Sequence, residues 1–314
     1  MSPEPSTSES LPPLAVEEFG FAVPGGELAV LRWPATEPGA STVLALHGIT
    51  ANALAWGAVA RRLAGRVTLV APDLRGRAAS AGVAGPYGLV RHADDAALLL
   101  AALGAGPAGG GPMVVAGHSM GAWATALTAV RHPELVRRVV LVDGAVSFPL
   151  PSGVSERDAL GAVLGPALDR LSMTFADLDA YRAFWRAHPA WESLEPGAMQ
   201  SYIERDLTGS APQLRSACVR EAIEVDGAQV LLDPAAARAV YELPCPGELL
   251  WAARGLRDEP QGLYDTRRLA GAEVAGPKLT LRHIAGSNHY SILMGEAGAT
   301  AVAERILAAA LGAA

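Results

Sequence analysis

The chain has 314 residues and a net charge of −7, and half of its residues are hydrophobic. This length suits one large domain with an insertion, and the acidic balance excludes the basic surface with which proteins bind nucleic acid or anionic membranes. The two cysteines, Cys218 and Cys245, lie in no CxxC pair, which predicts unremarkable thiols in a reducing compartment.

The first residues are predicted to be a disordered tail. Residues 1–14 are rich in proline and serine, with Glu4 and Glu9 where a secretory signal carries positive charge. We therefore expect a cytoplasmic protein. Residues 96–130 contain no Asp, Glu, Lys or Arg, but prolines and glycines interrupt them, which argues against a membrane span.

The predicted elements begin with a hairpin, because Pro24-Gly25-Gly26 separates two alternating segments. Short apolar strands then alternate with helices, which is typical of a parallel sheet covered on both faces. The predicted strands are 16–23, 28–33, 42–46, 67–71, 112–116, 138–142, 248–252 and 278–283. The helices predicted between them are 53–63, 92–103, 121–131, about 264–270 and about 297–311. The fold class is therefore α/β, with a mostly parallel eight-stranded sheet flanked by helices.

The alternation pauses between the sixth and seventh strands. Residues 147–243 are mostly helical and rich in aromatic side chains. An insertion at the carboxyl edge of the strands lies where open α/β sheets bind ligands, so we predict that this segment is a lid. The core then comprises residues 15–146 and 244–314.

The motif GHSMG at 117–121 follows an apolar strand and precedes a helix. A strand that turns at once into a helix needs unusual backbone angles at the turning residue, and side chains on either side would collide with the turn, which explains both glycines. The turn places the Ser119 hydroxyl above the sheet and the Met120 N–H at a helix N-terminus, where negative charge is favoured. We predict Ser119 as a nucleophile and Met120 as an oxyanion donor; the alternative is a tight turn with a bystander serine.

A serine hydroxyl is a weak nucleophile and needs a base. His289 lies between the last strand and the last helix, and the chain order of serine, acid and histidine is the one expected for this topology. Its alternative interpretation is a surface-loop histidine. His118 should point back toward the sheet. The other histidines are predicted to lie elsewhere. We expect His92 on a solvated helix face, His132 and His188 at helix ends, and His283 on the outward side of a strand.

The base needs a carboxylate that fixes its tautomer. Asp258, in the loop after the seventh strand, is the first choice, and Glu259 is the near alternative. Asp143, at the end of the sixth strand, is the third candidate. Loop carboxylates are usually solvated, so the sequence leaves all three open.

A second oxyanion donor is expected from the loop after the third strand, which reads His47-Gly48-Ile49-Thr50. We predict the Ile49 N–H, with Gly48 allowing close approach; the alternative is an ordinary strand-ending turn. An aromatic residue taken alone is more often part of the hydrophobic core than a contact for a ligand. The candidates for an apolar pocket are His47, Trp56, Trp123, Trp185 and Tyr290, with Trp191 and Tyr202 beside them.

These segments together resemble the α/β-hydrolase fold superfamily. The matching pieces are LHGIT at 46–50, PDLRGR at 72–77, GHSMG at 117–121, DG at 143–144, RGLRDE at 254–259 and SNHYS at 287–291. They run in the family's order across nearly the whole chain. The resemblance is to esterases, lactonases, cofactor-free haloperoxidases and carbon–carbon hydrolases. Epoxide hydrolases and haloalkane dehalogenases carry aspartate at the elbow, so alkyl-enzyme chemistry is not expected. The run Ala78-Ala79-Ser80 departs from relatives that have a further glycine there.

The resemblance and the residues imply a serine hydrolase that cleaves a hydrophobic carboxylic ester or lactone through an acyl-enzyme on Ser119, thioesters included. It needs no cofactor and no metal. Carbon–carbon bond hydrolysis or perhydrolase (haloperoxidase-type) activity on the same triad is one alternative. A ligand-binding receptor with weak turnover is another. The expected partner is a small hydrophobic substrate, not nucleic acid, and a monomer and a homodimer are both allowed.

Overall fold

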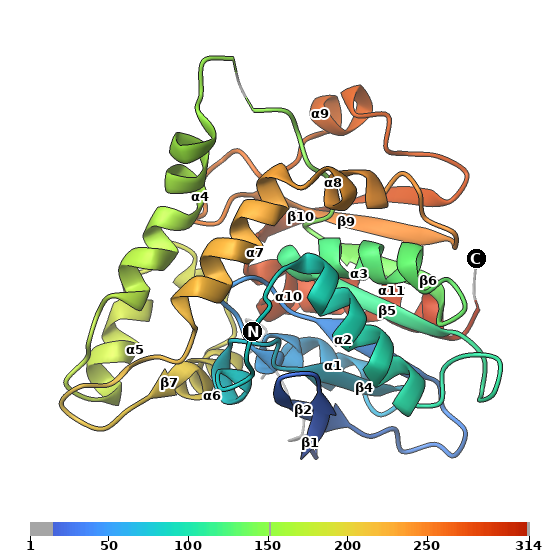
Figure 1. The fold of residues 1–314 in the computed structure, drawn as a ribbon, viewed down its shortest axis with the longest axis horizontal. Coiled ribbons are helices and arrows are strands. Elements are labelled where there is room, and N and C mark those ends of the chain that lie inside the picture. The colour runs from blue at the N-terminus through green and yellow to red at the C-terminus, as the bar shows by residue number, and fades with distance from the viewer. Residues whose placement is uncertain (1–14, 151, 313–314) are drawn as a thin grey trace, which may run out of the picture.

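The central feature of the fold is one eight-stranded sheet (Figure 1). The computed structural model describes residues 15–150 and 152–312, so the predicted tail 1–14 lies outside the described residues. The strand order is β1-β2-β4-β3-β5-β6-β9-β10. β1 pairs antiparallel with β2 and β2 antiparallel with β4, while every other pair is parallel. The strands are β1 (Glu17–Val23), β2 (Gly26–Trp33), β3 (Thr42–Leu46), β4 (Thr68–Pro72), β5 (Met113–His118), β6 (Val136–Val142), β9 (Gly247–Arg254) and β10 (Leu279–Asn288). The predicted fold class is confirmed.

Helices cover both faces of the sheet, which explains why its strands are apolar throughout. Val43 and Ala45 of β3 face one core cluster, and Leu44 and Leu46 face the other, because successive side chains of a strand alternate between faces. The first face carries η1 (Ala53–Trp56), α1 (Gly57–Leu63), α10 (Ser291–Met294) and α11 (Glu296–Ala310). The second face carries α2 (Leu89–Ala102), α3 (Met120–Arg131) and α8 (Pro234–Ala239). Two short helices, η2 (Ala78–Ser80) and α9 (Thr266–Gly271), lie in the connections.

The segment between β6 and β9 is mostly helical, as predicted, and its first helices lie to the left of the sheet in Figure 1. We call the part from α4 to α7 the helical insertion. It consists of α4 (Glu156–Leu171), α5 (Leu178–Arg186), η3 (Trp191–Ser193), α6 (Pro196–Asp206), β7 (Leu207–Thr208), β8 (Arg215–Ser216) and α7 (Arg220–Leu232). Within it α4 packs on α7, and α6 packs on η1 and η2 of the core. The next helix, α8, packs on α3, so the end of the segment predicted as a lid covers the sheet instead.

Side-chain caps define where several helices begin. Ser155 Oγ accepts from the Asp158 N–H at 3.1 Å, and Asp177 Oδ1 accepts from the Ala180 N–H at 2.8 Å. Both residues therefore satisfy N–H groups that a helix start leaves unpaired. No helix within residues 15–150 and 152–312 is long and apolar enough to cross a membrane.

Candidate active site

The turn from β5 into α3 has the strained geometry that the motif predicted. Ser119 has φ 52° and ψ −126°. A Cβ on Gly117 would lie 2.1 Å from the Gly121 carbonyl oxygen, and one on Gly121 would lie 2.3 Å from the Leu46 carbonyl oxygen. Side chains do not fit at either position. A non-glycine residue at positive φ is uncommon and is characteristic of functional sites.

His289 pairs with Asp143. Its Nδ1 lies 2.7 Å from Asp143 Oδ2, and both side chains are buried. Asp143 follows the last residue of β6, and its Oδ1 accepts from the Ala252 N–H at 3.0 Å. Since the carboxylate holds the proton on Nδ1, Nε2 of His289 is left as the basic nitrogen.

The prediction that Asp258 lies against His289 is wrong. Its Oδ1 accepts from Arg254 Nε at 2.6 Å and from Asn288 Nδ2 at 2.8 Å. These two bonds lower the pKa of the Asp258 carboxyl. Glu259 is exposed and accepts from the Arg257 N–H at 2.8 Å. Asp258 and Glu259 therefore accept hydrogen bonds from groups other than His289. The third candidate from the sequence, Asp143, lies against His289 instead.

Asp258 nevertheless supports the histidine loop. The amide that it holds, Asn288, accepts from the Tyr290 N–H at 3.0 Å and from the Ser291 N–H at 2.8 Å. These bonds fix the backbone that directly follows His289. The role of Asp258 is therefore one of support through Asn288.

His118 was expected to point toward the sheet, but it packs against His289 instead. Its Nε2 lies 2.9 Å from the His289 carbonyl oxygen, and the two ring centroids are 4.7 Å apart. Burial lowers the pKa of His118 well below its ordinary value, so the ring is neutral and Nε2–H donates. The residue before Ser119 thereby anchors the loop that carries His289.

The loop after β3 lies against Ser119. A Cβ on Gly48 would lie 3.2 Å from Ser119 Cβ, which is tighter than most such contacts. Met120 is the first residue of α3, so its N–H has no acceptor within the helix. The Ile49 and Met120 amides, the two predicted oxyanion donors, therefore come from segments that flank Ser119.

His47 fixes the orientation of the Ile49 amide. Its Nδ1 lies 2.8 Å from the Gly48 carbonyl oxygen, and its Nε2 accepts from the Leu74 N–H at 2.9 Å, so Nδ1 carries the proton. Because the peptide group is planar and trans, anchoring the Gly48 carbonyl points the Ile49 N–H to the opposite side. Burial lowers the pKa of His47 to about 3, so the ring stays neutral. Both ring nitrogens are thus engaged with the main chain, which differs from the pocket-lining role predicted for His47.

Two substitutions of His47 separate its two hydrogen bonds. Asparagine places an amide donor near the position of Nδ1, whereas glutamine places its oxygen near Nε2 and removes the bond to Gly48. We expect His47→Gln to lower kcat about 10- to 100-fold, because a misplaced donor stabilises the oxyanion poorly, and His47→Asn to lose less. Ester hydrolysis measured from pH 5 to 9 checks this result. The shape of the pH profile should not change, since His47 does not titrate in that range; equal activity of both variants and wild type would contradict the assignment.

The predicted pocket residues divide into two groups. Trp56 is fully buried in the core cluster on the α1 face, and Trp123 Nε1 donates to Ser147 Oγ at 2.9 Å. Tyr290 instead lies beside His289, with the two ring centroids 5.9 Å apart, and Trp185 packs on the Tyr290 ring at 6.3 Å. Tyr202 extends this aromatic group, 5.9 Å from Trp185, and Trp191 is half-buried in η3.

One buried cation lies next to these rings. The Arg170 guanidinium lies 5.5 Å from the Trp185 ring centroid and is paired with Asp206. It also donates to Tyr181 Oη at 2.6 Å. Its charge is therefore already neutralised within the insertion. Cys218 and Cys245 are both free and buried, and the described part of the chain holds no group of three or more His, Cys, Asp or Glu side chains arranged for a metal ion.

Comparison with known proteins identifies the family. A 2-(acetamidomethylene)succinate hydrolase of Mesorhizobium japonicum is 28% identical over 260 residues, covering 79% of this chain and 81% of that protein. Lipase LipV of Mycobacterium tuberculosis is 30% identical over 181 residues, covering 58% and 62%. The crystal structure of E-2-(acetamidomethylene)succinate hydrolase has a TM-score of 0.72 at 22% identity, covering 93% of this chain and 99% of that chain. A profile of the alpha/beta hydrolase family matches residues 43–305, and this chain therefore belongs to that family.

Proposed function

We propose that the protein is a serine hydrolase that cleaves a hydrophobic carboxylic ester or lactone through an acyl-enzyme on Ser119. The observation that carries the proposal is the 2.7 Å contact between His289 and Asp143 beside the strained Ser119 turn. Asp143 replaces Asp258 as the proposed acid. A nucleophile, a base and a carboxylate that orients the base form the arrangement that activates a serine hydroxyl.

The proposed cycle has two halves. His289 Nε2 takes the Ser119 proton while Oγ attacks the acyl carbon, and the Ile49 and Met120 amides receive the negative oxygen. The carbon–oxygen bond to the alcohol then breaks, and the alcohol takes the proton from His289. Water repeats the attack with His289 as base, which frees the acid and returns the proton to Ser119. Each oxyanion donor contributes about 3 kcal/mol to lowering the barrier.

The surroundings of His289 favour an uncharged acyl group. The Tyr290 ring lies 5.9 Å from His289, Trp185 and Tyr202 continue this aromatic group into the core, and Arg170 is already paired with Asp206. Burying a carboxylate among these rings without an available cation would cost several kcal/mol, on the order of the penalty for an unpaired buried charge. The lipase among the relatives agrees with an ester substrate.

A second candidate is hydrolysis of an acyl group bound to nitrogen. The observation behind it is the acetamido group in the name of the relative that covers 79% of this chain. The same groups would act, with His289 delivering its proton to the leaving nitrogen. Anilide and ester analogues with the same acyl group distinguish this candidate from the first.

Labelling with a fluorophosphonate probe tests the proposal. The probe reacts with an activated serine, so we expect a single adduct, located by mass spectrometry on the peptide that contains Ser119. A series of p-nitrophenyl esters from acetate to dodecanoate then measures the acyl preference. A folded protein that forms no adduct and hydrolyses neither esters nor lactones would refute the proposal and move attention to a binding role.

A further inference from the structure

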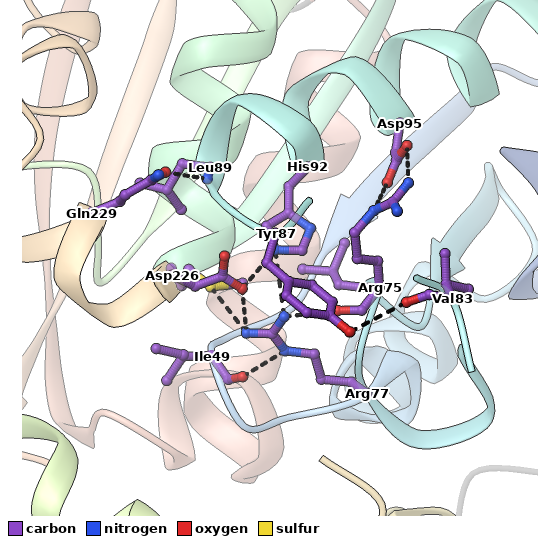
Figure 2. Close-up of polar contacts among 12 residues, drawn as sticks. Ile49, Arg75, Arg77, Val83, Tyr87, Leu89, His92, Asp95, Asp226 and Gln229 are labelled. Atoms are coloured by element: carbon purple, nitrogen blue, oxygen red, sulfur yellow. Dashed lines mark hydrogen bonds and ion pairs between the residues drawn. The ribbon is translucent and has the colours of Figure 1, made fainter. Parts of the chain in front are cut away.

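A buried cluster of charged side chains connects the helical insertion to the proposed oxyanion loop. It consists of Arg77, His92 and Asp226, all fully buried (Figure 2). Arg77 Nη2 lies 2.5 Å from Asp226 Oδ2, and His92 Nε2 lies 2.8 Å from the same oxygen. Burial alone would raise the pKa of the Asp226 carboxyl, but His92 and Arg77 hold it well below its ordinary value. Asp226 is therefore an anion that the core pairs with a cation.

Arg77 also contacts both segments that carry the proposed oxyanion donors. Its Nε donates to the Ile49 carbonyl oxygen at 2.9 Å, and its Nη2 lies 3.7 Å from Met120 Sδ. The Gly48 carbonyl is held by His47, as described above. The peptide groups on both sides of Ile49 are thus fixed, one by His47 from the core and one by Arg77.

The anion that holds Arg77 comes from the insertion, because Asp226 lies on α7. This helix is attached to the core near both ends. The Val219 N–H, just before α7, donates to the Gly76 carbonyl at 2.8 Å, and Gln229 Oε1 accepts from the Leu89 N–H at 2.7 Å. Figure 2 shows Gln229 and Asp226 reaching toward the core from the same helix. The position of Asp226 is therefore set by the docking of α7.

A second contact runs from the insertion to the same loop. Arg170 Nη2 donates to the Thr50 carbonyl oxygen at 3.4 Å, and Asn52 Nδ2 donates to the Tyr202 carbonyl oxygen at 2.9 Å. The insertion therefore contacts the loop after β3 at two positions that follow Ile49, Thr50 and Asn52.

We propose that Asp226 is a positioning residue for the oxyanion hole: through Arg77, it makes the alignment of the Ile49 amide depend on the docked position of α7. This inference rests on the proposed function, in which Ile49 is an oxyanion donor. When Asp226 is removed, the guanidinium loses its counter-ion and keeps the Arg75 and Ile49 carbonyls as acceptors, so its hold on the Ile49 carbonyl weakens. The catalytic groups Ser119, His289 and Asp143 remain in place.

The neighbouring pair of Arg75 and Asp95 supplies a matched control. Arg75 Nε lies 2.8 Å from Asp95 Oδ2, and this pair is also buried. The side chain of Arg75 donates to the carbonyls of Pro24 and Ala84, and not to the loop after β3. Figure 2 shows the Arg75 side chain directed to Asp95 and the Arg77 side chain directed to Ile49 and Asp226. Asp95→Asn therefore breaks a buried ion pair in the same region, while the bond from Arg77 Nη1 to the Arg75 main-chain carbonyl, at 2.8 Å, does not involve the Asp95 carboxylate.

The test compares Asp226→Asn with Asp95→Asn in steady-state ester hydrolysis and in the rate of fluorophosphonate labelling. We expect Asp226→Asn to lower kcat and the labelling rate about 10- to 100-fold with KM changed less than about threefold, because an oxyanion donor acts in the transition state. Asp95→Asn should keep both rates within about threefold of wild type, with a similar loss of Tm.

A double variant covers the case in which Asp226→Asn does not fold. Arg77→Met with Asp226→Leu removes both charges and leaves no unpaired buried ion. It should lower kcat about 10- to 100-fold, as expected for Asp226→Asn, because the Ile49 carbonyl again loses the guanidinium that Asp226 holds in place. Equal rates for Asp226→Asn, the double variant and Asp95→Asn would overturn the inference while leaving the proposed function intact. A wild type that is not labelled at Ser119 would instead overturn the proposed function.

Discussion

Replacing Ser119 with alanine will reduce release of nitrophenolate from p-nitrophenyl butyrate to the rate in buffer. Loss of the nucleophile of a serine hydrolase lowers kcat by about 10⁶, and the oxyanion donors alone leave little measurable turnover. The variant should fold normally, because the methyl group of alanine meets the same steric limits at this turn as Cβ of serine. Tm measured beside activity checks this point.

Ser201→Ala is the matched control for this substitution. Ser201 is exposed on α6, and alanine is the better helix former there. Its kcat should equal that of wild type. Comparable hydrolysis by Ser119→Ala and wild type would show that the GHSMG turn carries no nucleophile.

Asp143→Asn should lower kcat by about 10⁴, the cost typical of a histidine held in the wrong tautomer. The geometry shows how this occurs. Asp143 Oδ1 accepts from the Ala252 N–H, so the asparagine oxygen will keep that bond and present its NH₂ group to His289 Nδ1. Nδ1 must then accept, and Nε2 carries the proton and cannot serve as the base. The measurement is kcat over a range of pH, with Tm to show that the variant is folded.

Asp258→Asn is the control, since it changes the acid that the sequence favoured. The amide can still accept from Asn288, and only the charge beside Arg254 is lost. We expect less than about a tenfold change in kcat, because a half-exposed ion pair contributes little. A larger loss in Asp258→Asn than in Asp143→Asn would reverse the assignment of the acid.

The sequence predicted those features that local backbone chemistry determines. The Ser119 turn could be read from its glycines, and the sheet could be read from its apolar strands. The acid could not be chosen in this way, because its identity depends on which strand end lies nearest to His289. Asp143 is 146 residues away from His289, and Asp258 only 31, yet strand order brings the distant residue into contact. Asp258 was favoured because it lies close to His289 in the sequence, whereas the strand order of the sheet places Asp143 against His289.

The same limit explains why the buried ion cluster was missed. In the sequence, Arg77 and Asp226 are separated by strands β5 and β6 and by most of the helical insertion. Asp226 lies in a helix whose sequence alternates charged and apolar residues without a distinct motif. His118 was placed wrongly for a related reason. A residue at the end of a strand leaves the alternation of the sheet, and its direction is then set by the loop that it meets.

The position of Asp143, directly after β6, leaves the loop after β9 available for a reporter group. Ser119 and Asp143 directly follow His118 and Val142, which are paired partners in neighbouring strands, so their spacing follows from the hydrogen-bond ladder alone. Leu256, in the loop after β9, is exposed and does not belong to that ladder. Burial raises the pKa of both native thiols, Cys218 and Cys245, to about 11, which makes them slow to alkylate. Leu256→Cys would therefore accept a fluorescent dye selectively, close to the histidine loop, so that substrate arrival and product departure could be followed in real time.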